Sequence, residues 1–497
     1  MGKQYKSWTP EQPFLLPPSP LEWLPEGHLA HFILDLVGEL DLSSVEGAVQ
    51  SKDPRGTRPY SPMMTTALLL YGYCVGVFSS RKLERATYED VAFRVLCGGN
   101  HPDHSRIAKF RRVHLQGLRG LFLQVLKLCQ LAGMVKLGHV AIDGTKLQAN
   151  ASKHKAMSYA RMVQMERRLQ EEIDALLARA EAIDASEDAR YGRGCREDDL
   201  PAELRRRETR LARIREAKAR LEAQTAEARA RTLRIQAHRA TEKAGADTVK
   251  ASERKRAATR AQTQAAQARE LAPNRDDDDI DPPTTPEGLP THEPKATTEG
   301  TPDAKAQMNS TDPDSRILES QGGFVQGYNG QAAVDDAHQV IVAEALTNQS
   351  PDNGHLIPMI QQVRNNCGDA PAAVTGDAGY WNAKVEAAAT GMGTEAYVAT
   401  ERRRHWDADD GVTQGQAAPD AAPRERMRHK LRTEYGRSIY ARRKSTVEPV
   451  FGQTKEARGF RRFHLRGLAG AAGEWSLLCC SHNLLKLFRF RLTATAD

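Results

Sequence analysis

Three short segments of the chain each place one carboxylate among residues suited to metal-bound phosphate chemistry. The segments are VAIDGTKLQAN around Asp143, AAVTGDAGYW around Asp377 and STVEPVFGQTKEARGFRR around Glu448. The first two are typical of strands that end at an acid, and the third is typical of a basic helix. Two divalent ions about 3.5–4 Å apart can clamp the attacking and leaving oxygens of a phosphodiester displacement. The three acids are therefore candidate catalytic residues and candidate ligands for two Mg²⁺ or Mn²⁺ ions.

The residues beside the first two acids fit this chemistry. Gly144 lets the backbone approach a phosphate, and the charge of Lys146 can screen one. Small residues on both sides of Asp377 leave room for a metal ion and a phosphate. The aromatic pair Tyr380 and Trp381 can stack on an unpaired base or pack over the sheet edge. The sequence favours neither role.

The region of Glu448 combines an acid with many basic side chains. Helical spacing places Glu448 and Lys455 on one face, at i and i+7. Pro449 fits best in a first helical turn, so we expect the helix to begin near Glu448 and to leave Lys444 outside. The basic side chains exceed what one carboxylate needs and suit a phosphate backbone. They are Arg442, Arg443, Arg458, Arg461, Arg462 and Arg466.

Composition sets broad limits. The 497 residues suffice for two or three domains. A net charge of +7 and a pI of about 8.9 favour a polyanionic partner, although ribosomal and membrane-surface proteins share such values. The seven cysteines show no metal-binding spacing, which indicates reduced thiols. No apolar run reaches the roughly 18 residues that span a bilayer, and the N-terminus lacks a signal-peptide stretch, so we expect a cytoplasmic protein with no membrane partner.

Residues 1–136 are predicted to form a helical domain behind a proline-rich arm. The expected helices run from Pro62 to about Phe78, from Ser80 to Gly98, from Ser105, and from Leu118 to Leu131. The third helix carries the basic residues Lys109, Arg111 and Arg112. Short helices with a basic third member fit a helix-turn-helix-like DNA reader. A helical packing or dimerisation domain is the alternative.

Residues 137–152 are predicted to form the first strand of a second domain, and residues 153–272 a helical insertion. Sustained heptads with Arg and Glu between them indicate a coiled coil. Glycines 192 and 194 and Pro201 would break a continuous helix, so we expect two long helices in an antiparallel hairpin. The apolar positions that recur every seventh residue are Met162, Leu169, Leu176 and Ile183, and then Ile214, Leu221, Ala228 and Ile235.

The rest of the chain returns to a sheet after a polar stretch. Residues 273–311 are acidic and rich in Pro and Thr, which predicts a disordered linker. The run Asp276–Asp279 is expected to be solvated. Residues 312–490 alternate strands and helices and complete one α/β domain with residues 137–152. Residues 491–497 are expected to be a tail.

The three acidic segments resemble the DDE transposases of bacterial insertion sequences, in the group whose catalytic core is RNase H-like. The segments that carry the resemblance, in the order of that group, are AIDGTKLQANASKHKAMSY, DPDSRI, GGFVQGYNGQAAVDDAHQVIVAEALTNQSPDNG, GDAGYW and YARRKSTVEPVFGQTKEARGFRRF. The similarity covers most of residues 1–155 and 312–490. The resemblance implies an α/β fold with an RNase H-like mixed sheet flanked by helices. The all-α N-terminal domain and the inserted coiled-coil hairpin, both predicted from the helical patterns above, would accompany that sheet. Many relatives carry their insertion nearer the glutamate, so no family role is transferred to the insertion after the first strand.

The same resemblance implies roles for particular residues. Asp143, Asp377 and Glu448 match the three acids that hold divalent metal. Tyr440 and Lys455 resemble the tyrosine and lysine of the C-terminal signature, with Lys455 as a phosphate contact. In that signature one arginine often lies both three residues after the tyrosine and four residues before the glutamate. Here Arg443 lies three residues after Tyr440, and Lys444 lies four residues before Glu448. The complete set of expected DNA contacts is Lys109, Arg111, Arg112, Lys146, Tyr380, Trp381, Tyr440, Arg443, Lys444, Lys455, Arg458, Arg461 and Arg462.

The implied activity is transposition. Metal-dependent hydrolysis at an element end frees a 3′-hydroxyl, which then attacks target DNA. The implied partners are double-stranded DNA, as inverted repeats and target, and further copies of the chain, because two ends must be brought together. Two alternatives remain open: a DNA-binding protein whose catalytic core has decayed, and an RNase H-like nuclease without strand transfer.

Several other polar residues are weaker candidates. Asn353 and His355 can support the site from behind its metal ligands, although neither is assigned a catalytic role. His482 and Asn483 lie in an apolar helix and are expected to be core residues. Asp312 and Asp314 in TDPDSR are expected to cap turns. The pair Asp335 and Asp336 is expected to make a hairpin turn.

Overall fold

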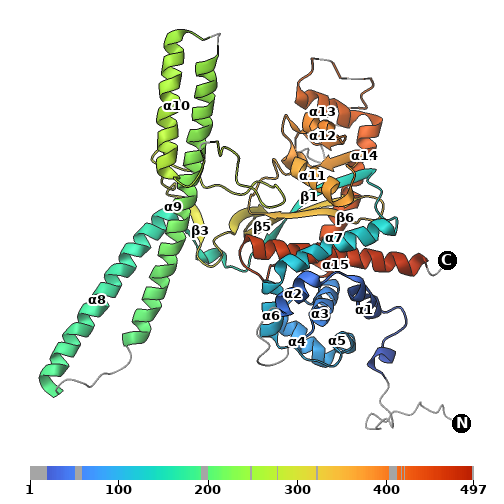
Figure 1. Ribbon diagram of the computed structural model, residues 1–497, viewed down its shortest axis with the longest axis horizontal. Coiled ribbons are helices and arrows are strands. Elements are labelled where there is room, and N and C mark those ends of the chain that lie inside the picture. Colours follow the sequence, from blue (N-terminus) through green and yellow to red (C-terminus); the bar gives the residue numbers. More distant parts are fainter. Residues whose placement is uncertain are drawn as a thin grey trace. The chain divides into compact units, whose positions relative to one another are not determined.

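The computed structural model describes residues 19–50, 59–191, 200–246, 249–276, 278–320, 323–401, 411–415, 417–418 and 420–494. The proline-rich arm and glycines 192 and 194 lie outside the described residues. The chain divides into two compact units. The first comprises the chain up to Ala132 with Glu456–Gly459 and the chain from Leu477 onward, and the second comprises Gly133–Lys455 with Phe460–Ser476. Figure 1 labels their helices and strands.

The first unit is helical, as predicted. Its elements are η1 (Pro20–Trp23), α1 (Leu29–Glu39), α2 (Ser43–Gln50), α3 (Pro62–Val75), α4 (Ser80–Glu89), α5 (Val91–Leu96), α6 (His104–Val113), α7 (Leu115–Leu131) and the end of α15 (Leu468–Ala494). The side chain of Ser61 caps α3 by accepting a hydrogen bond from the Met64 amide. The single helix expected from Ser80 to Gly98 is two helices, because Asp90 stops α4 and caps α5 through the amides of Ala92 and Phe93.

The last helix was placed wholly in the catalytic domain by the sequence, but from Leu477 onward it belongs to the first unit. It also continues past the predicted end at Phe490 to Ala494. His482 and Asn483 are buried, which confirms them as core residues. No single described helix is long and apolar enough to cross a membrane, although α3 and α4 together, bent by 97°, meet that criterion by length and composition.

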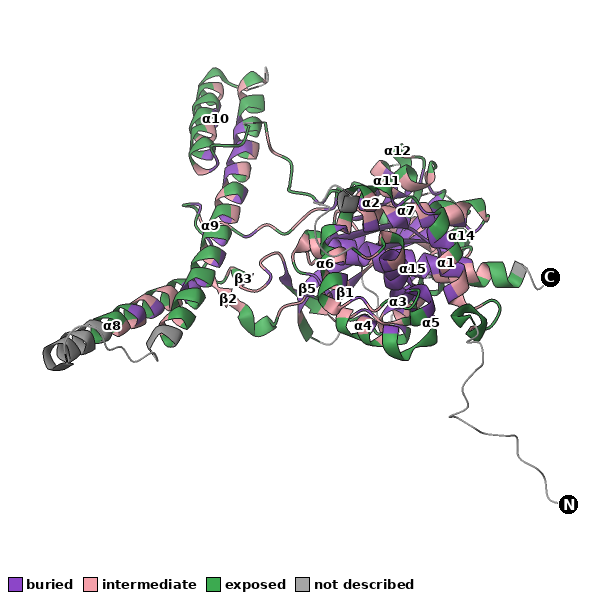
Figure 2. Cartoon of the chain, turned by 60° about the horizontal axis from the view of Figure 1, so that its bottom comes forward, coloured by how far each residue is buried: buried purple, intermediate pink, exposed green. Residues whose placement is uncertain are grey.

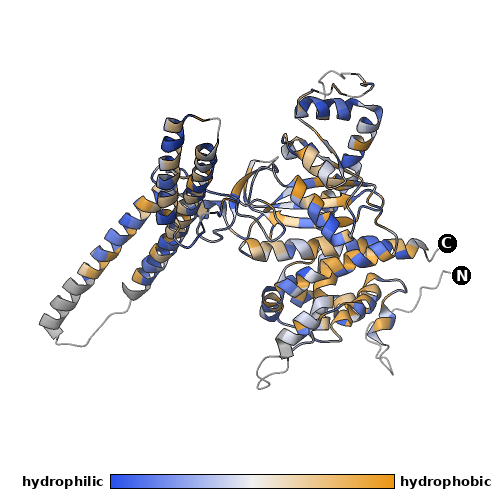
Figure 3. Cartoon of the chain, turned by 45° about the horizontal axis from the view of Figure 1, so that its top comes forward, coloured by the Kyte–Doolittle hydropathy of each residue, from blue (hydrophilic) through white to orange (hydrophobic). Residues whose placement is uncertain are grey.

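The second unit contains a mixed sheet with helices, which confirms the α/β class. Its strands are β1 (His139–Gln148), β4 (Arg316–Ser320), β5 (Gly323–Asp335), β6 (Ile341–Thr347), β7 (Ala373–Gly376) and β8 (Glu395–Val398). β5 pairs antiparallel with β1, β4 and β6, whereas β1, β7 and β8 are parallel to one another. The accompanying helices are α11 (Leu356–Cys367), α12 (Val385–Gly391), α13 (Pro423–Arg432) and α14 (Glu434–Gly452). α14 contacts β1, β5, β7 and β8, and α13 is almost entirely hydrophilic (Figure 3).

The inserted helices lie between β1 and β4, and a two-stranded sheet closes their base. β2 (Ala156–Ser158) pairs antiparallel with β3 (Gln307–Asn309). The described part of the insertion contains the two expected long helices, α8 (Tyr159–Tyr191) and α9 (Leu200–Gly245). The continuation to about Ala272, for which the sequence allows a helical or partly frayed form, is a third helix, α10 (Ala251–Leu271), and α8 and α10 both pack on α9. Ion pairs of Arg215 with Glu166 (3.0 Å) and of Arg207 with Glu172 (3.1 Å) set α8 antiparallel to α9.

The heptad pattern predicts the buried residues of these helices in part. Met162, Leu169, Ile214, Leu221 and Ala228 are buried, and such residues form stripes along α8 and α9 (Figure 2). Leu176 and Ile235 are only half-buried, and the side chain of Ile183 lies outside those described. Toward the C-terminal end of α9, alanines of α10 pack against it. The seven-residue spacing of buried positions therefore does not continue along that part of α9.

The expected disordered linker has an ordered path over its described residues. Leu289 is buried, and the turns at Thr284–Pro290 and Ala296–Pro302 are each closed by a bridge. Thr347 donates a hydrogen bond to the Pro290 carbonyl, and the His292 amide donates to Asn348 Oδ1 (2.8 Å). The prediction of disorder was wrong because prolines and backbone hydrogen bonds, rather than large apolar side chains, hold this stretch.

Candidate active site

The register of two parallel strands brings the first two acids together. β1 pairs with β7 through Val140 with Val374 and Ala141 with Thr375. Asp143 and Asp377 each lie two residues beyond the last of these pairs. Because neighbouring strands are about 4.8 Å apart, the two acids emerge side by side where β7 ends. The side chain of Asp377 also accepts a hydrogen bond from the Gly379 amide (2.8 Å), which starts the short helix η3 (Ala378–Tyr380).

Glu448 lies in the middle of a helix rather than at its start, so the predicted boundary was wrong. α14 runs from Glu434 to Gly452 with Pro449 inside it, and Lys444 is part of the helix. A proline at this position cannot donate to the Ser445 carbonyl. The side-chain amide of Gln339 donates to that carbonyl instead, at 2.8 Å. This substitute hydrogen bond explains why the helix continues through a proline.

The predicted i to i+7 relation of Glu448 and Lys455 assumes one regular α-helix, which does not extend to Lys455. α14 is followed directly by a π-helical turn, η4 (Gln453–Ala457), which contains Lys455. A π-helical turn has more residues than an α-helical turn, so the spacing of a regular helix does not apply across it. Such turns are frequent at functional sites.

Arg443 joins two of the three acids. Its Nη1 lies 3.1 Å from Asp143 Oδ2, and its Nη2 lies 3.9 Å from Glu448 Oε1. The Arg443 side chain is largely buried, whereas the Glu448 side chain is 54% exposed. The guanidinium group therefore acts as the counter-cation of an acidic cluster that reaches from β1 to α14.

The surroundings of Asp143 oppose its negative charge. Burial raises the pKa of Asp143 to about 6. Arg443 acts against this shift, while the charges of Asp377 and Asp352 add to it. A carboxylate in such a position gains free energy from any additional cation near it.

A fourth acid, Asp352, belongs to the same cluster and was missed by the sequence analysis. Its Oδ1 accepts hydrogen bonds from Asn329 (2.7 Å) and Gln331 (2.8 Å) and lies 3.3 Å from Lys146 Nζ. Burial raises the pKa of Asp352, but these partners and His355 outweigh that effect and lower it to about 2. The clue in the sequence was the motif SPDNGH, in which only Asn353 and His355 were singled out.

Gly144 is closely surrounded by this network of side chains. A Cβ at position 144 would lie 2.3 Å from Gln331 Nε2 and 2.9 Å from Asp352 Oδ1. From the sequence, this glycine was expected to let the backbone approach a phosphate. The structure gives a different reason, because the space beside residue 144 is filled by side chains of the protein itself.

Tyr380 cannot stack on a base in this structure, so the first of its two proposed roles is wrong. Its side chain is fully buried, and its hydroxyl hydrogen-bonds to Gln331 Oε1. It packs at the sheet edge, which was the alternative. Trp381 is half-buried. Asn353 Oδ1 accepts a hydrogen bond from Asn382, and buried His355 lies with Nδ1 3.7 Å from Asp352.

Two of the expected DNA contacts are structural residues. Arg111 is buried and donates to the Tyr73 hydroxyl and the Phe78 carbonyl, both at 3.0 Å. Arg458 is buried and donates to Ser481 Oγ at 2.7 Å. Both predictions were wrong because the local sequence around these basic residues does not reveal which way their side chains face. The exposed candidates are Lys109, Arg112, Lys444, Arg461 and Arg462, and the half-buried ones are Lys146, Trp381, Tyr440, Arg443 and Lys455.

A basic cavity adjoins Asp377. It has a volume of about 650 Å³ and lies between the end of β8 and the helices α13 and α14. Arg428 on its wall pairs with Glu401 at 3.0 Å. The other charged and aromatic residues that line it are Arg432, Arg437, Tyr440, Arg443 and Lys444. The cavity offers several cations next to an acid at the strand end.

The acids suit divalent metal, although the described residues contain no group of three His, Cys, Asp or Glu arranged around one ion. Carboxylate oxygens are the ligands that Mg²⁺ prefers. Asp143 and Asp377 supply such oxygens side by side, and Arg443 is a cation already held by Asp143. The donor set therefore fits the group, with Glu448 exposed at its margin.

A mixed sheet that ends in paired acids beside a basic helix defines the protein as a candidate phosphodiester-processing α/β protein. A family model described as a transposase DDE domain matches residues 411–488, the part that contains Glu448. A second model, described as a transposase domain, matches residues 19–113. The same comparisons found no match among curated proteins and none among solved structures. The two family matches support a DDE transposase of an insertion element.

Proposed function

We propose that the chain cleaves DNA at the ends of its insertion element and joins the freed 3′-hydroxyl to target DNA, with Asp143, Asp377 and Glu448 as metal ligands. The observation that carries the proposal is the link through Arg443. Two acids from adjacent parallel strands lie side by side, and Arg443 connects one of them to the helical acid Glu448. This brings residues more than 300 positions apart in the sequence to one place.

The protein's own side chains would position the DNA. Divalent ions bound at the acids would activate the attacking oxygen and stabilise charge on the leaving oxygen. Asp352 holds the ammonium group of Lys146 beside Asp143, where it can contact a phosphate. The arginines of the cavity beside Asp377 would follow the backbone of the strand. Arg461 and Arg462 adjoin the end of β1 through the backbone bond from Gln148 to Arg461 and the bridge from Gln148 to Arg462.

The proposal also includes how the element ends are recognised and brought together. Lys109 and Arg112 on α6 are exposed and would contact duplex DNA. Two ends must be present in one complex, so the active form would be a dimer or higher oligomer on DNA. The core would have the RNase H-like arrangement, which the strand pairing supports. We place the activity in the cytoplasm, where the DNA of a bacterial element is found.

The test uses DNA from either side of the gene. Inverted repeats found there supply duplex ends, which are incubated with the full chain and Mg²⁺. We expect cleavage at the repeat boundary and joined products, both absent with a chelator. Asp377→Asn should bind the same duplex with similar affinity and yield no product.

The alternatives predict different products. A decayed DNA-binding protein would bind the repeats and cut nothing under any metal condition. A nuclease without strand transfer would give cut DNA and no joined DNA. Full activity of Asp377→Asn would contradict the assignment of the acids.

A further inference from the structure

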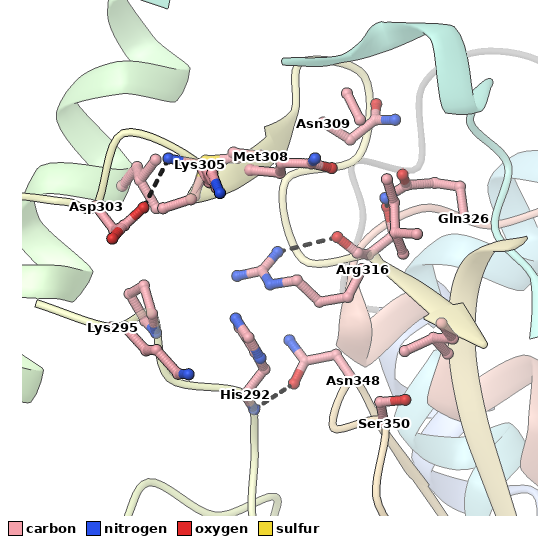
Figure 4. A pocket seen from close by; sticks show the side chains of 18 residues that line it. His292, Lys295, Asp303, Lys305, Met308, Asn309, Arg316, Gln326, Asn348 and Ser350 are labelled. Carbon is pink, nitrogen blue, oxygen red and sulfur yellow. Dashed lines mark hydrogen bonds between the residues drawn. The ribbon is translucent and has the colours of Figure 1, made fainter. Parts of the chain in front are cut away.

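A second cationic pocket lies at the base of the inserted helices, apart from the four acids. It has a volume of about 490 Å³ (Figure 4). β3, β4 and the chain between Ser350 and β6 contribute to its walls, together with the stretch around His292. Its apolar lining comes from Leu221, Pro294, Met308, Ile317 and Leu318. A pocket of this size accommodates a small organic molecule.

The guanidinium group of Arg316 lies in the middle of this pocket (Figure 4). Arg316 is only 7% exposed. Its Nη1 donates to the carbonyls of Pro313 and Ser315 and its Nη2 to Gln224 Oε1 (3.3 Å), but its Nε has no partner among the described residues. Burial of an arginine without a carboxylate contact is costly unless an anion is present. An anionic group bound in the pocket would compensate the buried charge of Arg316.

The nearest acids in the sequence are engaged elsewhere. Asp314 pairs with Arg220 and accepts a hydrogen bond from the Leu468 amide. Asp312 accepts hydrogen bonds from the Tyr328 hydroxyl and the Gly467 amide. Neither carboxylate forms an ion pair with Arg316 among the described residues, so the positive charge in the pocket is not neutralised by direct contact.

The mouth of the pocket carries further positive charge. Lys295 and Lys305 are exposed and form no ion pair with any described residue. The one acid of the lining, Asp303, accepts a hydrogen bond from the Lys305 amide (2.8 Å). Figure 4 shows His292 and Lys295 on one side of Arg316, with Lys305 and Asp303 on another. Three cations thus face an opening with apolar walls.

The side chain of Gln326 contributes a second atom without a hydrogen-bond partner among the described residues. Gln326 is 5% exposed, and its Nε2 donates to Ser315 Oγ at 2.7 Å. Its Oε1 accepts no hydrogen bond from any described residue. A donor group of a ligand, such as a hydroxyl or an amino group, would satisfy this acceptor.

We propose that this pocket binds one nucleotide. Its phosphate would contact Arg316 and the two lysines, its base would lie against Pro294 and Met308, and a hydroxyl or amino group would donate to Gln326. A free nucleoside monophosphate and the terminal nucleotide of a DNA strand share this chemistry. The proposal goes beyond the cleavage and joining of DNA and does not require it.

The test is equilibrium dialysis of the full chain with a chelator present, so that no metal can bind phosphate at the acids. The probes are dAMP, inorganic phosphate and a five-nucleotide single strand. We expect saturable binding of dAMP or of the strand, tighter than that of inorganic phosphate. Lys295→Gln with Lys305→Gln should weaken this binding about tenfold, since two charge-assisted contacts are lost. Binding of dAMP identifies a free nucleotide as ligand, whereas binding of the strand alone identifies DNA.

Two matched double variants complete the design. Lys250→Gln with Lys255→Gln removes the same charge from exposed positions on and next to α10 and should leave binding unchanged. Arg437→Gln with Lys444→Gln removes two positive charges from the cavity beside Asp377. This double variant should also leave dAMP binding unchanged. The proposal is overturned if neither dAMP nor the strand binds up to millimolar concentration. It is equally overturned if the Lys295 and Lys305 variant binds as the wild type does, or if only the Arg437 and Lys444 variant loses binding.

Discussion

Arg443 Nη1 lies 3.1 Å from Asp143 Oδ2, which places a guanidinium group beside an acid proposed to hold metal. The same side chain reaches Glu448 at 3.9 Å. A positive charge so close to two proposed ligands competes with a divalent ion for them. The metal-free site is therefore stabilised by its own arginine.

Arg443→Gln should increase the affinity of the free protein for Mg²⁺. Removal of a unit charge about 3–4 Å from the ligands is worth at least about tenfold in affinity at the effective dielectric of a protein surface. Calorimetric titration at pH 8, where Asp143 is ionised, measures the change. Arg443→Lys retains the charge and should remain close to the wild type. Unchanged or weaker Mg²⁺ binding by Arg443→Gln would contradict this role.

Asp143 should make the metal-free protein less stable as the pH rises. Its pKa in the folded protein is about 6, above the ordinary value of 3.8. Between these values the folded state binds more protons than the unfolded state, so the free energy of unfolding falls with rising pH. Asp143→Asn removes this contribution and should gain about 2 kcal/mol relative to the wild type from pH 4 to pH 7. Denaturant unfolding with a chelator at several pH values tests the sign, and a constant difference between the two proteins would refute it.

Asp352 should be important for the stability of the second unit. Asp352→Ala leaves Lys146, Asn329 and Gln331 without their shared acceptor, and we expect a loss of about 3 kcal/mol. Asp352→Asn keeps one acceptor oxygen and should lose less. Chemical denaturation provides the measurement. If alanine and asparagine have equal and small effects, the network does not depend on this residue.

Neighbouring arginines on α6 should behave differently. Arg111→Gln should lower the free energy of unfolding of the first unit by about 2–4 kcal/mol, because it loses buried hydrogen bonds to Tyr73 and Phe78. Arg112→Gln should leave stability within about 0.5 kcal/mol. It should weaken DNA binding and reduce its salt dependence by about one charge. Thermal unfolding and binding at several salt concentrations separate the two effects, and the reverse pattern would disprove this assignment.

The three acids could be identified from the sequence because each lies in a recognisable element. Asp143 and Asp377 end apolar runs typical of strands, and Glu448 lies in a basic segment typical of a helix. β1 and β7 are short apolar runs followed by an acid, and their parallel pairing makes Asp143 and Asp377 neighbours. The helix of Glu448 was harder to define. Pro449 indicated a helix start, and nothing in the local sequence revealed that Gln339, far along the chain, replaces the missing hydrogen bond.

Other features depended on tertiary contacts that no local pattern encodes. Asp352 lies in an ordinary loop motif. Its importance comes from its ion pair with Lys146 and its hydrogen bonds with Asn329 and Gln331, which lie on two other strands. Arg111 lies on α6 and Arg458 lies directly after η4, and both are buried by the packing of the first unit, which the local sequence does not reveal. The ordered path of residues 278–311 depends on hydrogen bonds to the loop after β6 rather than on its own composition.

The most direct measurement of the central claim is the binding of Mn²⁺ to the complex of the full chain with an element-end duplex, followed by electron paramagnetic resonance. Asp143→Asn, Asp377→Asn and Glu448→Gln should each weaken Mn²⁺ binding at least about tenfold, because each removes a charged ligand. Glu401→Gln, which changes an acid of the adjoining cavity, should bind Mn²⁺ as the wild type does. If all three ligand variants bind Mn²⁺ as tightly as the wild type, the three carboxylates do not share a metal site.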